Sequence, residues 1–350
     1  MPRLNVREIE DYPWVPSVVR DAITAFLRTI TALLRPFDGA APVLVALLPL
    51  SRRPRAAAAA AADRPTDPAP AEASQNRIVD LCSGGGGALV DLMLRPGLLP
   101  ADCTAALTDL YPNEGAFAFL ERRLPGRVFG VKTPVDAGAV AAGADGDAGA
   151  GAVGGGRRSG EAGEDGDRPS AALSLRGVRT IFNALHHLPP QSVEAAMRDA
   201  RRANEPFAAF EVVERHPLAL LAFFFAMPFV PFFLMPFSRP LRPLNLLLTY
   251  VVPVVPLVAA VDGFLSCLRA YSLEELEGFC AGANREAAAE AAAEAKAAAL
   301  VAGGDGALAP GPPPPPAYVW RVGVAPRDLF GLMPFRLVWL EGRPGSSLAA

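Results

Sequence analysis

The segment IVDLCSGGGGALV, residues 78–90, joins a short apolar run that contains Asp80 to four consecutive glycines at 84–87. The apolar run predicts a buried β-strand, and residues 88–94 after the glycines predict a helix. Glycines between a strand and a helix let the backbone approach a ligand that any Cβ would block. The segment therefore predicts a loop of the nucleotide-binding type, and an ordinary Gly-rich turn is the alternative interpretation.

Strands and helices alternate along the chain around this segment. Apolar runs predict five strands, and helix-forming stretches lie between them. The strands are expected at 77–81, 105–110, 127–131, 178–183 and 208–214, and the helices at 113–123 and 191–202. Two further strands, at 318–324 and 336–341, are expected to form an antiparallel pair at the edge. We therefore predict an α/β fold with a Rossmann-like, seven-stranded, mostly parallel sheet that has helices on both faces and binds ligands beyond the carboxyl ends of its strands.

The glycine segment resembles the first motif of the class I S-adenosylmethionine-dependent methyltransferases, in which two hydrophobic residues, an acid and a third hydrophobic residue precede a Gly-x-Gly-x-Gly turn. Asp80, Gly84 and Gly86 match that motif, and Gly85 lies between the two glycines. Cys82 stands where the family most often has its first glycine, a place at which cysteine also occurs among methyltransferases. The resemblance covers about residues 78–214 and implies S-adenosyl-L-methionine as the cofactor.

Residues at three further strand ends match the same family in the same order. Asp109 ends the second strand, where the family places an acid that accepts hydrogen bonds from the ribose hydroxyls. Asp136 and Ala137 follow the third strand and resemble the pair that commonly meets the adenine, while IFNALHHLPP at 181–190 resembles the fourth-strand motif beside the methyl-transfer centre. The resemblance therefore implies a cofactor site made of Asp80, Cys82, Gly84, Gly85, Gly86, Asp109, Asp136, Ala137 and Asn183.

Three other segments resemble a bacterial-type group of uncharacterised methyltransferases. They are EIEDYPWVPSVVRD at 8–21, FEVVERHP at 210–217 and TYVVPVVPLVAAVDGFLSCLRAYSLEEL at 249–276. The resemblance to this group does not identify a methyl acceptor.

A nicotinamide dinucleotide is the alternative ligand for a Gly-rich loop of this kind. Its Gly-x-Gly-x-x-Gly motif requires a small residue three places after the second glycine. Leu89 or Val90 occupies that place, depending on which pair of glycines is taken as the start. The sequence therefore disfavours an NAD-dependent oxidoreductase.

Two of the three histidines, His186 and His187, are adjacent at the end of the fourth predicted strand. Methyl transfer from a sulfonium depends on near-attack geometry and needs a base when the acceptor is protonated. Either histidine is a candidate for that base, and a structural histidine that fixes the loop is the alternative. The four cysteines form no CxxC pair and have no close histidine partners, so the sequence predicts no metal site.

The composition favours a large folded core and argues against a nucleic-acid partner. Hydrophobic residues make up 51% of the chain and charged residues 20%, which provides enough apolar surface for a core. The formal net charge is −3 with no sustained basic face, so the chain lacks the surface with which proteins bind phosphates. Glu8, Glu10 and Asp11 argue against a secretory signal. We expect a protein of the cytoplasm or of a membrane periphery, with no obligate protein partner.

We predict one catalytic domain with additions. Residues 1–55 are expected to be an N-terminal helical cover, 56–76 a low-complexity linker, and 77–350 the methyltransferase-like domain. Insertions are expected at 138–171 (disordered), 217–265 (an apolar cap or membrane-facing segment) and 284–316 (rich in Ala, Gly and Pro). Ser272 and Glu275 have capping-box spacing, which predicts a helix start, and residues 284–300 predict a solvated helix.

An apolar excursion at 217–261 separates the fifth predicted strand from the sixth. Its halves, 217–238 and 243–261, contain no charge, and each approaches the ~20 apolar residues that span a bilayer. Prolines interrupt both halves, and a two-pass hairpin would send Arg239 and Arg242 to the far side, against the positive-inside tendency. We therefore expect a cap over the acceptor pocket, contact with a membrane interface, or both, ahead of a full span.

Together these features predict transfer of a methyl group from S-adenosyl-L-methionine to an O, N or C atom of a small acceptor, and the apolar excursion favours a lipophilic one. A membrane-associated binding protein with a degenerate methyltransferase fold is the rival from another class. An NAD-dependent oxidoreductase is the weaker rival.

Overall fold

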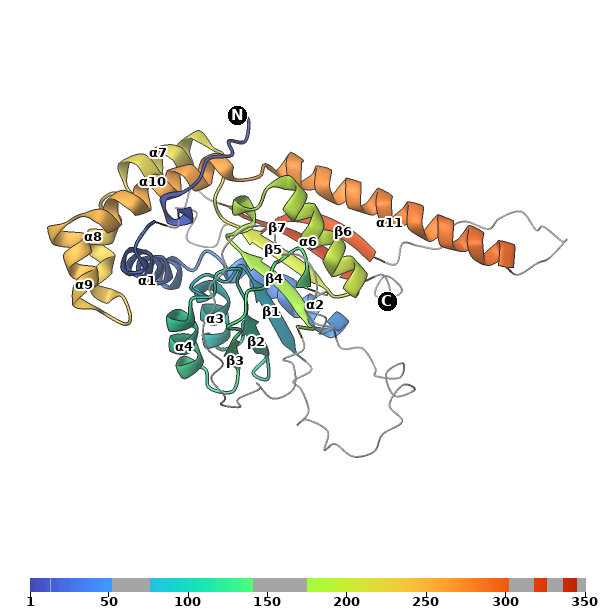
Figure 1. The fold of residues 1–350 in the computed structure, drawn as a ribbon, viewed down its shortest axis with the longest axis horizontal. Coiled ribbons are helices and arrows are strands. Elements are labelled where there is room, and N and C mark those ends of the chain that lie inside the picture. Colours follow the sequence, from blue (N-terminus) through green and yellow to red (C-terminus); the bar gives the residue numbers. More distant parts are fainter. Residues whose placement is uncertain (13, 52–75, 141–174, 302–317, 326–335, 345–350) are drawn as a thin grey trace, which may run out of the picture.

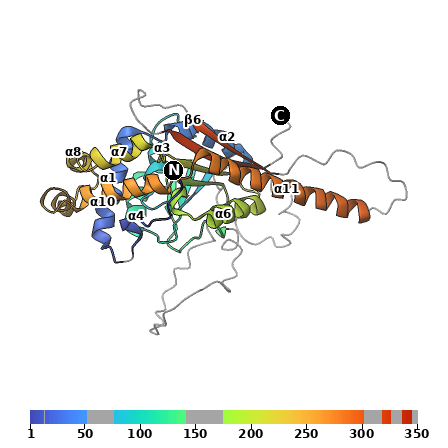
Figure 2. The ribbon, with the colours of Figure 1, turned by 90° about the horizontal axis from the view of Figure 1, so that it is seen from above.

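A computed structural model of the chain describes residues 1–12, 14–51, 76–140, 175–301, 318–325 and 336–344 (Figure 1). Most of the predicted linker at 56–76, most of the predicted insertion at 138–171 and the part of the 284–316 insertion after residue 301 lie outside these described residues. The described residues form a central sheet with helices on both faces and a group of helices at one end (Figures 1 and 2).

The sheet has seven strands in the order β3-β2-β1-β4-β5-β7-β6. Their bounds are β1 Arg77–Leu81, β2 Thr104–Leu107, β3 Val128–Gly130, β4 Val178–Phe182, β5 Phe207–Glu211, β6 Tyr318–Ala325 and β7 Leu337–Pro344. The first five strands are parallel, and β7 runs antiparallel to both β5 and β6. The predicted Rossmann-like sheet with an antiparallel pair at the edge is therefore confirmed.

Two hydrophobic cores cover the two faces of the sheet, because side chains alternate along each strand. Ile78 belongs to the core under α2, α3 and α4, whereas the next residue, Val79, belongs to the core under α6 and α11. The bounds of these helices are α2 Ala41–Ser51, α3 Gly87–Leu94, α4 Glu114–Arg123, α6 Pro190–Ala203 and α11 Leu273–Val301. The predicted arrangement of helices on both faces is confirmed.

The helices at one end of the sheet come from the N-terminal segment and from the apolar excursion. They are α1 Ser17–Leu34, α7 Pro217–Phe225, α8 Val230–Leu234, α9 Pro243–Leu246 and α10 Val254–Arg269. Ala22, Ile23 and Phe26 share one face of α1, and they pack against Val255 and Val258 of α10. The N-terminal cover and the excursion therefore form one cap, which Figure 1 shows on the side of the sheet away from the free end of α11.

The helix predicted to begin near Ser272 and the solvated helix predicted at 284–300 are one continuous helix, α11. The predicted capping box is present: the backbone N–H of Ser272 donates to Glu275 Oε2 at 2.8 Å, and that of Glu275 donates to Ser272 Oγ at 3.2 Å. No proline lies between Leu273 and Val301, and the helix continues through Gly278 and Gly282 into the alanine-rich stretch.

The apolar excursion is broken into short helices by its prolines, as the sequence predicts. Among the described helices, none is by itself both long and apolar enough to cross a bilayer, although three bent pairs meet that test by length and composition.

Candidate functional site

The loop between β1 and α3 makes its turn through left-handed backbone conformations. Gly84 has a φ of 50° and Gly86 a φ of 63°, which glycine adopts without strain. Cys82 adopts the same region with a φ of 53°. Glycine adopts this conformation without strain. This is a physical reason why the methyltransferase motif most often has glycine where this chain has Cys82.

The four glycines have different structural roles. A Cβ on Gly85 would lie 2.3 Å from Thr24 of α1, and one on Gly87 would lie 2.5 Å from Arg28 of the same helix. A Cβ on Gly86 would meet leucine side chains of the core. Only Gly84 has open space, with nothing within 4 Å of its ideal Cβ position. Gly85 and Gly87 therefore leave the space that α1 occupies. Gly84 is the position at which a ligand can approach the backbone.

Asp80 is buried beneath this loop and ties it to the sheet. Thr180 Oγ1 of β4 donates to Asp80 Oδ1 at 2.7 Å, and Ser83 Oγ donates to Oδ2 at 2.9 Å. Burial raises the pKa of Asp80 to about 7, against the lowering effect of these two hydrogen bonds. Asp80 therefore positions the loop, and its carboxyl group binds a proton more tightly in the folded state than in the unfolded state.

The raised pKa of Asp80 predicts how stability depends on pH. The stability that this proton contributes is complete below the unfolded pKa near 4 and is lost as the pH rises through about 7. The Asp80→Asn variant cannot titrate, so its free energy of unfolding should fall less than that of the wild type between pH 5 and pH 8, by about 2 kcal/mol. Urea denaturation at the two pH values measures this difference, and parallel losses in both proteins would contradict it.

Asp109 and Asn183 lie at the mouth of the glycine loop, where β2 and β4 end. The backbone N–H of Gly84 donates to Asp109 Oδ2 at 2.8 Å, and that of Tyr111 donates to Oδ1 at 2.9 Å. Asn183 has a φ of 49°, and its Oδ1 accepts a hydrogen bond from Val212 N–H at 3.2 Å. The two residues line the same cavity as the glycine loop.

Asp136 and Ala137 lie at the margin of that cavity and do not line it. Asp136 is exposed and accepts a hydrogen bond from Gly138 N–H at 2.8 Å, whereas Ala137 is buried in the core beneath α6. Their neighbour Pro134 does line the cavity. The ends of β1, β2 and β4 therefore meet at the cavity. Asp136 and Ala137, which were predicted to contact the adenine, do not line it.

The cavity has a volume of about 1330 Å³. The glycine loop and the ends of β2 and β4 form one side, and α1, α7 and α10 contribute to the rest of its lining. A typical ligand pocket measures roughly 300–1,000 Å³, so this cavity has room for a nucleotide-sized cofactor and a second molecule.

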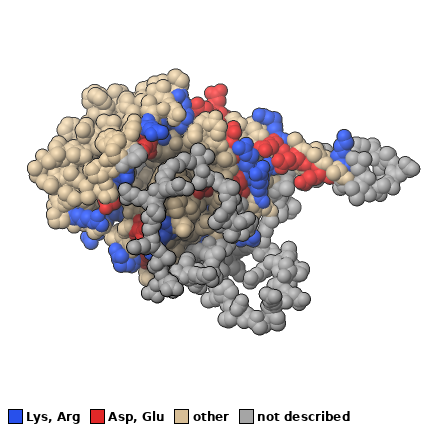
Figure 3. Space-filling model, viewed as in Figure 1, with Lys and Arg blue, Asp and Glu red and all other residues tan. Residues whose placement is uncertain are grey.

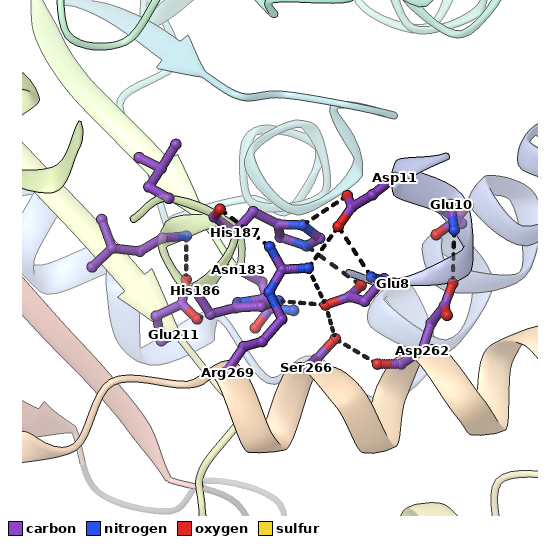
Figure 4. Close-up of polar contacts among 12 residues, drawn as sticks. Glu8, Glu10, Asp11, Asn183, His186, His187, Glu211, Asp262, Ser266 and Arg269 are labelled. Carbon is purple, nitrogen blue, oxygen red and sulfur yellow. Dashed lines mark hydrogen bonds and ion pairs between the residues drawn. The ribbon is translucent and has the colours of Figure 1, made fainter. Parts of the chain in front are cut away.

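The two predicted histidines sit in a cluster of carboxylates at the cavity wall (Figure 4). His186 is buried, and its Nδ1 lies 2.7 Å from Glu211 Oε2. His187 is partly exposed, and its Nδ1 lies 3.2 Å from Asp11 Oδ1. Both Nε2 atoms face Glu8, at 3.7 Å from Oε1 for His186 and 3.5 Å from Oε2 for His187.

One face of α10 closes the cluster. Asp262, Ser266 and Arg269 follow each other at helical spacing and point to the N-terminal segment (Figure 4). Ser266 Oγ donates to Glu8 Oε1 at 2.9 Å, and Arg269 Nη1 donates to Asp11 Oδ2 at 2.6 Å. The cluster therefore depends on contacts between residues about 250 positions apart in the sequence.

Burial and hydrogen bonding set the protonation of these carboxyl groups. Burial raises the pKa of Glu8 to about 7, against the lowering effect of His187 and Arg269. Burial also raises the pKa of Asp262, although the backbone N–H groups of Ile9 and Glu10 donate to it. Burial therefore opposes ionisation of Glu8 and Asp262, and each binds a proton more tightly than it would in water.

Four residues of the cluster were not predicted as site residues: Glu8, Asp11, Ser266 and Arg269. A signal was present: polar residues at 262, 266 and 269 share one face of an otherwise apolar helix. Polar residues at helical spacing in an apolar segment predict a polar contact on that face.

Solved structures are similar to this chain, two of which are described here, whereas no family model and no curated protein matches it. The first is the methyltransferase domain of bacterial CtHen1, with 11% identity and a TM-score of 0.34 over 76% of this chain and 89% of that one. The second is the CMeT domain of citrinin polyketide synthase, with 12% identity and a TM-score of 0.32 over 76% of this chain and 46% of that one. Both are methyltransferase structures. The similarity is remote and identifies neither a ligand nor an acceptor.

Proposed function

We propose that this protein transfers a methyl group from S-adenosyl-L-methionine to a small, apolar acceptor. One observation carries the proposal: the glycine loop, Asp109 and Asn183 share a single cavity with the histidines and an apolar wall. The strand order, with β7 reversed between β5 and β6, agrees with the class I methyltransferase fold that the glycine segment implies.

The glycine side of the cavity fits a nucleotide that carries a ribose. Both oxygens of Asp109 accept backbone hydrogen bonds, which hold the carboxylate at the cavity mouth, where a ribose diol can donate to it. Gly84 leaves the backbone open beside it. When bound, S-adenosyl-L-methionine supplies a methyl group activated by a positively charged sulfonium.

The helical part of the cavity lining fits an apolar acceptor. Phe26 and Leu27 of α1 contribute to it together with Phe223, Met227 and Ala259 of the excursion. His186 and His187 line the same cavity and are the candidate bases, since an imidazole accepts a proton near neutral pH. An apolar molecule with one ionisable O–H or N–H group matches this combination.

The three segments that resemble the bacterial-type group of methyltransferases meet at the cluster. Glu8 and Asp11 come from the first segment, Glu211 from the second, and Ser266 and Arg269 from the third. Segments that lie far apart in the sequence thus contact one another at this cluster, and membership of that group is part of this proposal.

Calorimetric titration with S-adenosyl-L-methionine tests the proposal. The wild type should bind it, and Asp109→Ala should weaken binding by roughly 10- to 100-fold, because charge-assisted hydrogen bonds are worth about 1.5–3 kcal/mol. Asp102→Ala is the matched control, since Asp102 lies at the other end of β2 and bonds Asn76.

The titration also separates the rival functions. A wild type that ignores the cofactor at saturating concentration would refute the proposal and favour a binding protein with a degenerate site. Binding of NADH in its place would favour an oxidoreductase. Equal affinities of the wild type and Asp109→Ala for S-adenosyl-L-methionine would show that Asp109 does not bind the ribose.

A second proposal concerns the outer surface of the cap, which we infer to contact a lipid bilayer. Fourteen large hydrophobic side chains of the excursion are exposed: Leu218, Leu221, Phe224, Phe225, Phe229, Phe233, Phe237, Leu241, Leu244, Leu247, Tyr250, Val251, Val252 and Leu257. The only charges in the excursion are Arg239 and Arg242, and Arg242 also pairs with Asp21 of α1 at 3.1 Å; cationic side chains at such a surface match anionic headgroups. Figure 3 shows this end as a broad surface with few charges. Monomeric soluble proteins rarely expose so large an apolar patch.

A further inference from the structure

Three ligand-type side chains converge at the cavity wall. One ligand atom from each of Glu8, His186 and His187 lies within 4.8 Å of the other two. Glu8 comes from the N-terminal segment, whereas the histidines come from the short helix Leu185–His187 after β4. Two imidazoles and one carboxylate are a donor set that proteins use for divalent transition metals.

The buried histidine has an unused lone pair that points into this group. Glu211 accepts a hydrogen bond from the backbone N–H of Leu185 at 2.7 Å and lies 2.7 Å from His186 Nδ1. A carboxylate can only accept, so Nδ1 of His186 carries a proton, and in the neutral imidazole Nε2 carries the lone pair. Among the described residues, this Nε2 has no hydrogen-bond partner, although the side chain is only 1% exposed. A buried polar atom without a partner is costly unless a ligand satisfies it.

We infer that Glu8, His186 and His187 bind one divalent transition-metal ion. Two ligands about 2.1 Å from a tetrahedral ion lie about 3.4 Å apart, and the Glu8 oxygens lie 3.5 and 3.7 Å from the two Nε2 atoms. Side-chain adjustments of a fraction of an ångström therefore bring these pairs to coordination distance.

The surroundings of both histidines match those of metal ligands. A metal-bound histidine almost always directs its other ring nitrogen to a carboxylate, a carbonyl or a water molecule. Here Glu211 takes that place for His186 and Asp11 for His187, at 2.7 and 3.2 Å. The same contact between Nδ1 and a carboxylate thus occurs at both His186 and His187, and packing of the loop alone does not require it.

The local charge also favours a divalent cation. Glu8, Asp11 and Glu211 are the carboxylates next to the two histidines, and Arg269, which is 3.4 Å from Glu8, is the cation that contacts them. These carboxylates outnumber the cation that contacts them among the described residues, which favours a positively charged ligand. The three ligand residues also line the cavity, and a bound ion would take the Nε2 lone pairs, so the two histidines would then hold the ion and would not act as the base.

Titration of the full-length chain, stripped with EDTA, tests the inference. Co²⁺ reports binding by its visible absorption and Zn²⁺ by calorimetry. The wild type should bind one equivalent. Glu8→Gln and His187→Ala should weaken binding by more than about 100-fold, since even the outer partners of metal ligands change affinity 10- to 100-fold. His216→Ala is the matched control, because the third histidine caps α7 outside the cavity.

Circular dichroism of each variant shows whether it has folded, and Glu8→Gln keeps the shape of the side chain if His187→Ala does not fold. A wild type that binds neither ion at 100 µM, which is tenfold above a Kd of about 10 µM, would overturn the inference. Equal affinities in the wild type and in folded Glu8→Gln would also overturn it. Titration of the same samples with S-adenosyl-L-methionine keeps the outcomes separate, because either ligand can bind while the other does not.

Discussion

Replacing Phe225, Phe233 and Phe237 together by serine is expected to abolish binding of the protein to phospholipid vesicles. These side chains are 63%, 73% and 72% exposed, so their loss removes little from the folded core. Burial of one phenylalanine is worth about 1.5–3 kcal/mol, and three together correspond to a loss of roughly a thousandfold or more in partitioning. Flotation with vesicles of mixed neutral and anionic phospholipid measures the bound fraction.

A matched control replaces exposed hydrophobic residues outside the excursion. Phe129 of β3 and Val324 of β6 are exposed, and their serine variants should float with the vesicles as the wild type does. Arg239 and Arg242 should add a preference for anionic vesicles that high salt weakens. A wild type that stays in the unbound fraction, or a control that loses binding as fully as the triple variant, would contradict contact with a bilayer.

Replacing Glu211 by alanine is expected to lower the free energy of unfolding by about 3 kcal/mol, because two buried donors lose their acceptor at about 1–3 kcal/mol each. The donors are the backbone N–H of Leu185 and the ring N–H of His186. Urea denaturation measures the change. The same variant should weaken Co²⁺ binding by about 10- to 100-fold, because the ring of His186 is no longer oriented.

Glu214→Ala is the control for this prediction. Glu214 lies three residues further along the chain and pairs with Arg336, whose side chain is about half exposed. An exposed pair contributes about 0–1 kcal/mol, and Glu214 also accepts the backbone N–H of Arg336, so the variant should lose less stability than Glu211→Ala and should bind Co²⁺ as the wild type does. Equal destabilisation by the two variants would show that the hydrogen bonds of Glu211 do not anchor the histidine loop.

The layout of the sheet could be predicted because each strand carries its own signal. Ile78 and Val79 both belong to an apolar run, as a strand buried on two faces requires. Strand ends were less accurate. The fifth strand was predicted to reach residue 214 and ends at Glu211, where its pairing with Val338 of β7 also ends. A pairing partner more than 100 residues away leaves no mark in the local pattern.

The residues of the candidate site also divide into those that could be predicted from the sequence and those that could not. Asp109 and Asn183 were predictable, because the carboxyl ends of parallel strands meet at one edge of a sheet. Glu8 and Arg269 were not, because they meet only once the N-terminal segment has folded against α10. The positions of the strand-end residues follow from the sheet topology. The cluster instead depends on how the N-terminal segment packs against α10.

The position of α1 links events at the two ends of the cavity. This helix touches the glycine loop through Thr24 and Arg28, and it packs against the excursion through Ile23 and Phe26. Under the proposed function, we expect a shift of α1 on cofactor binding to be passed to the excursion, because this helix packs against both.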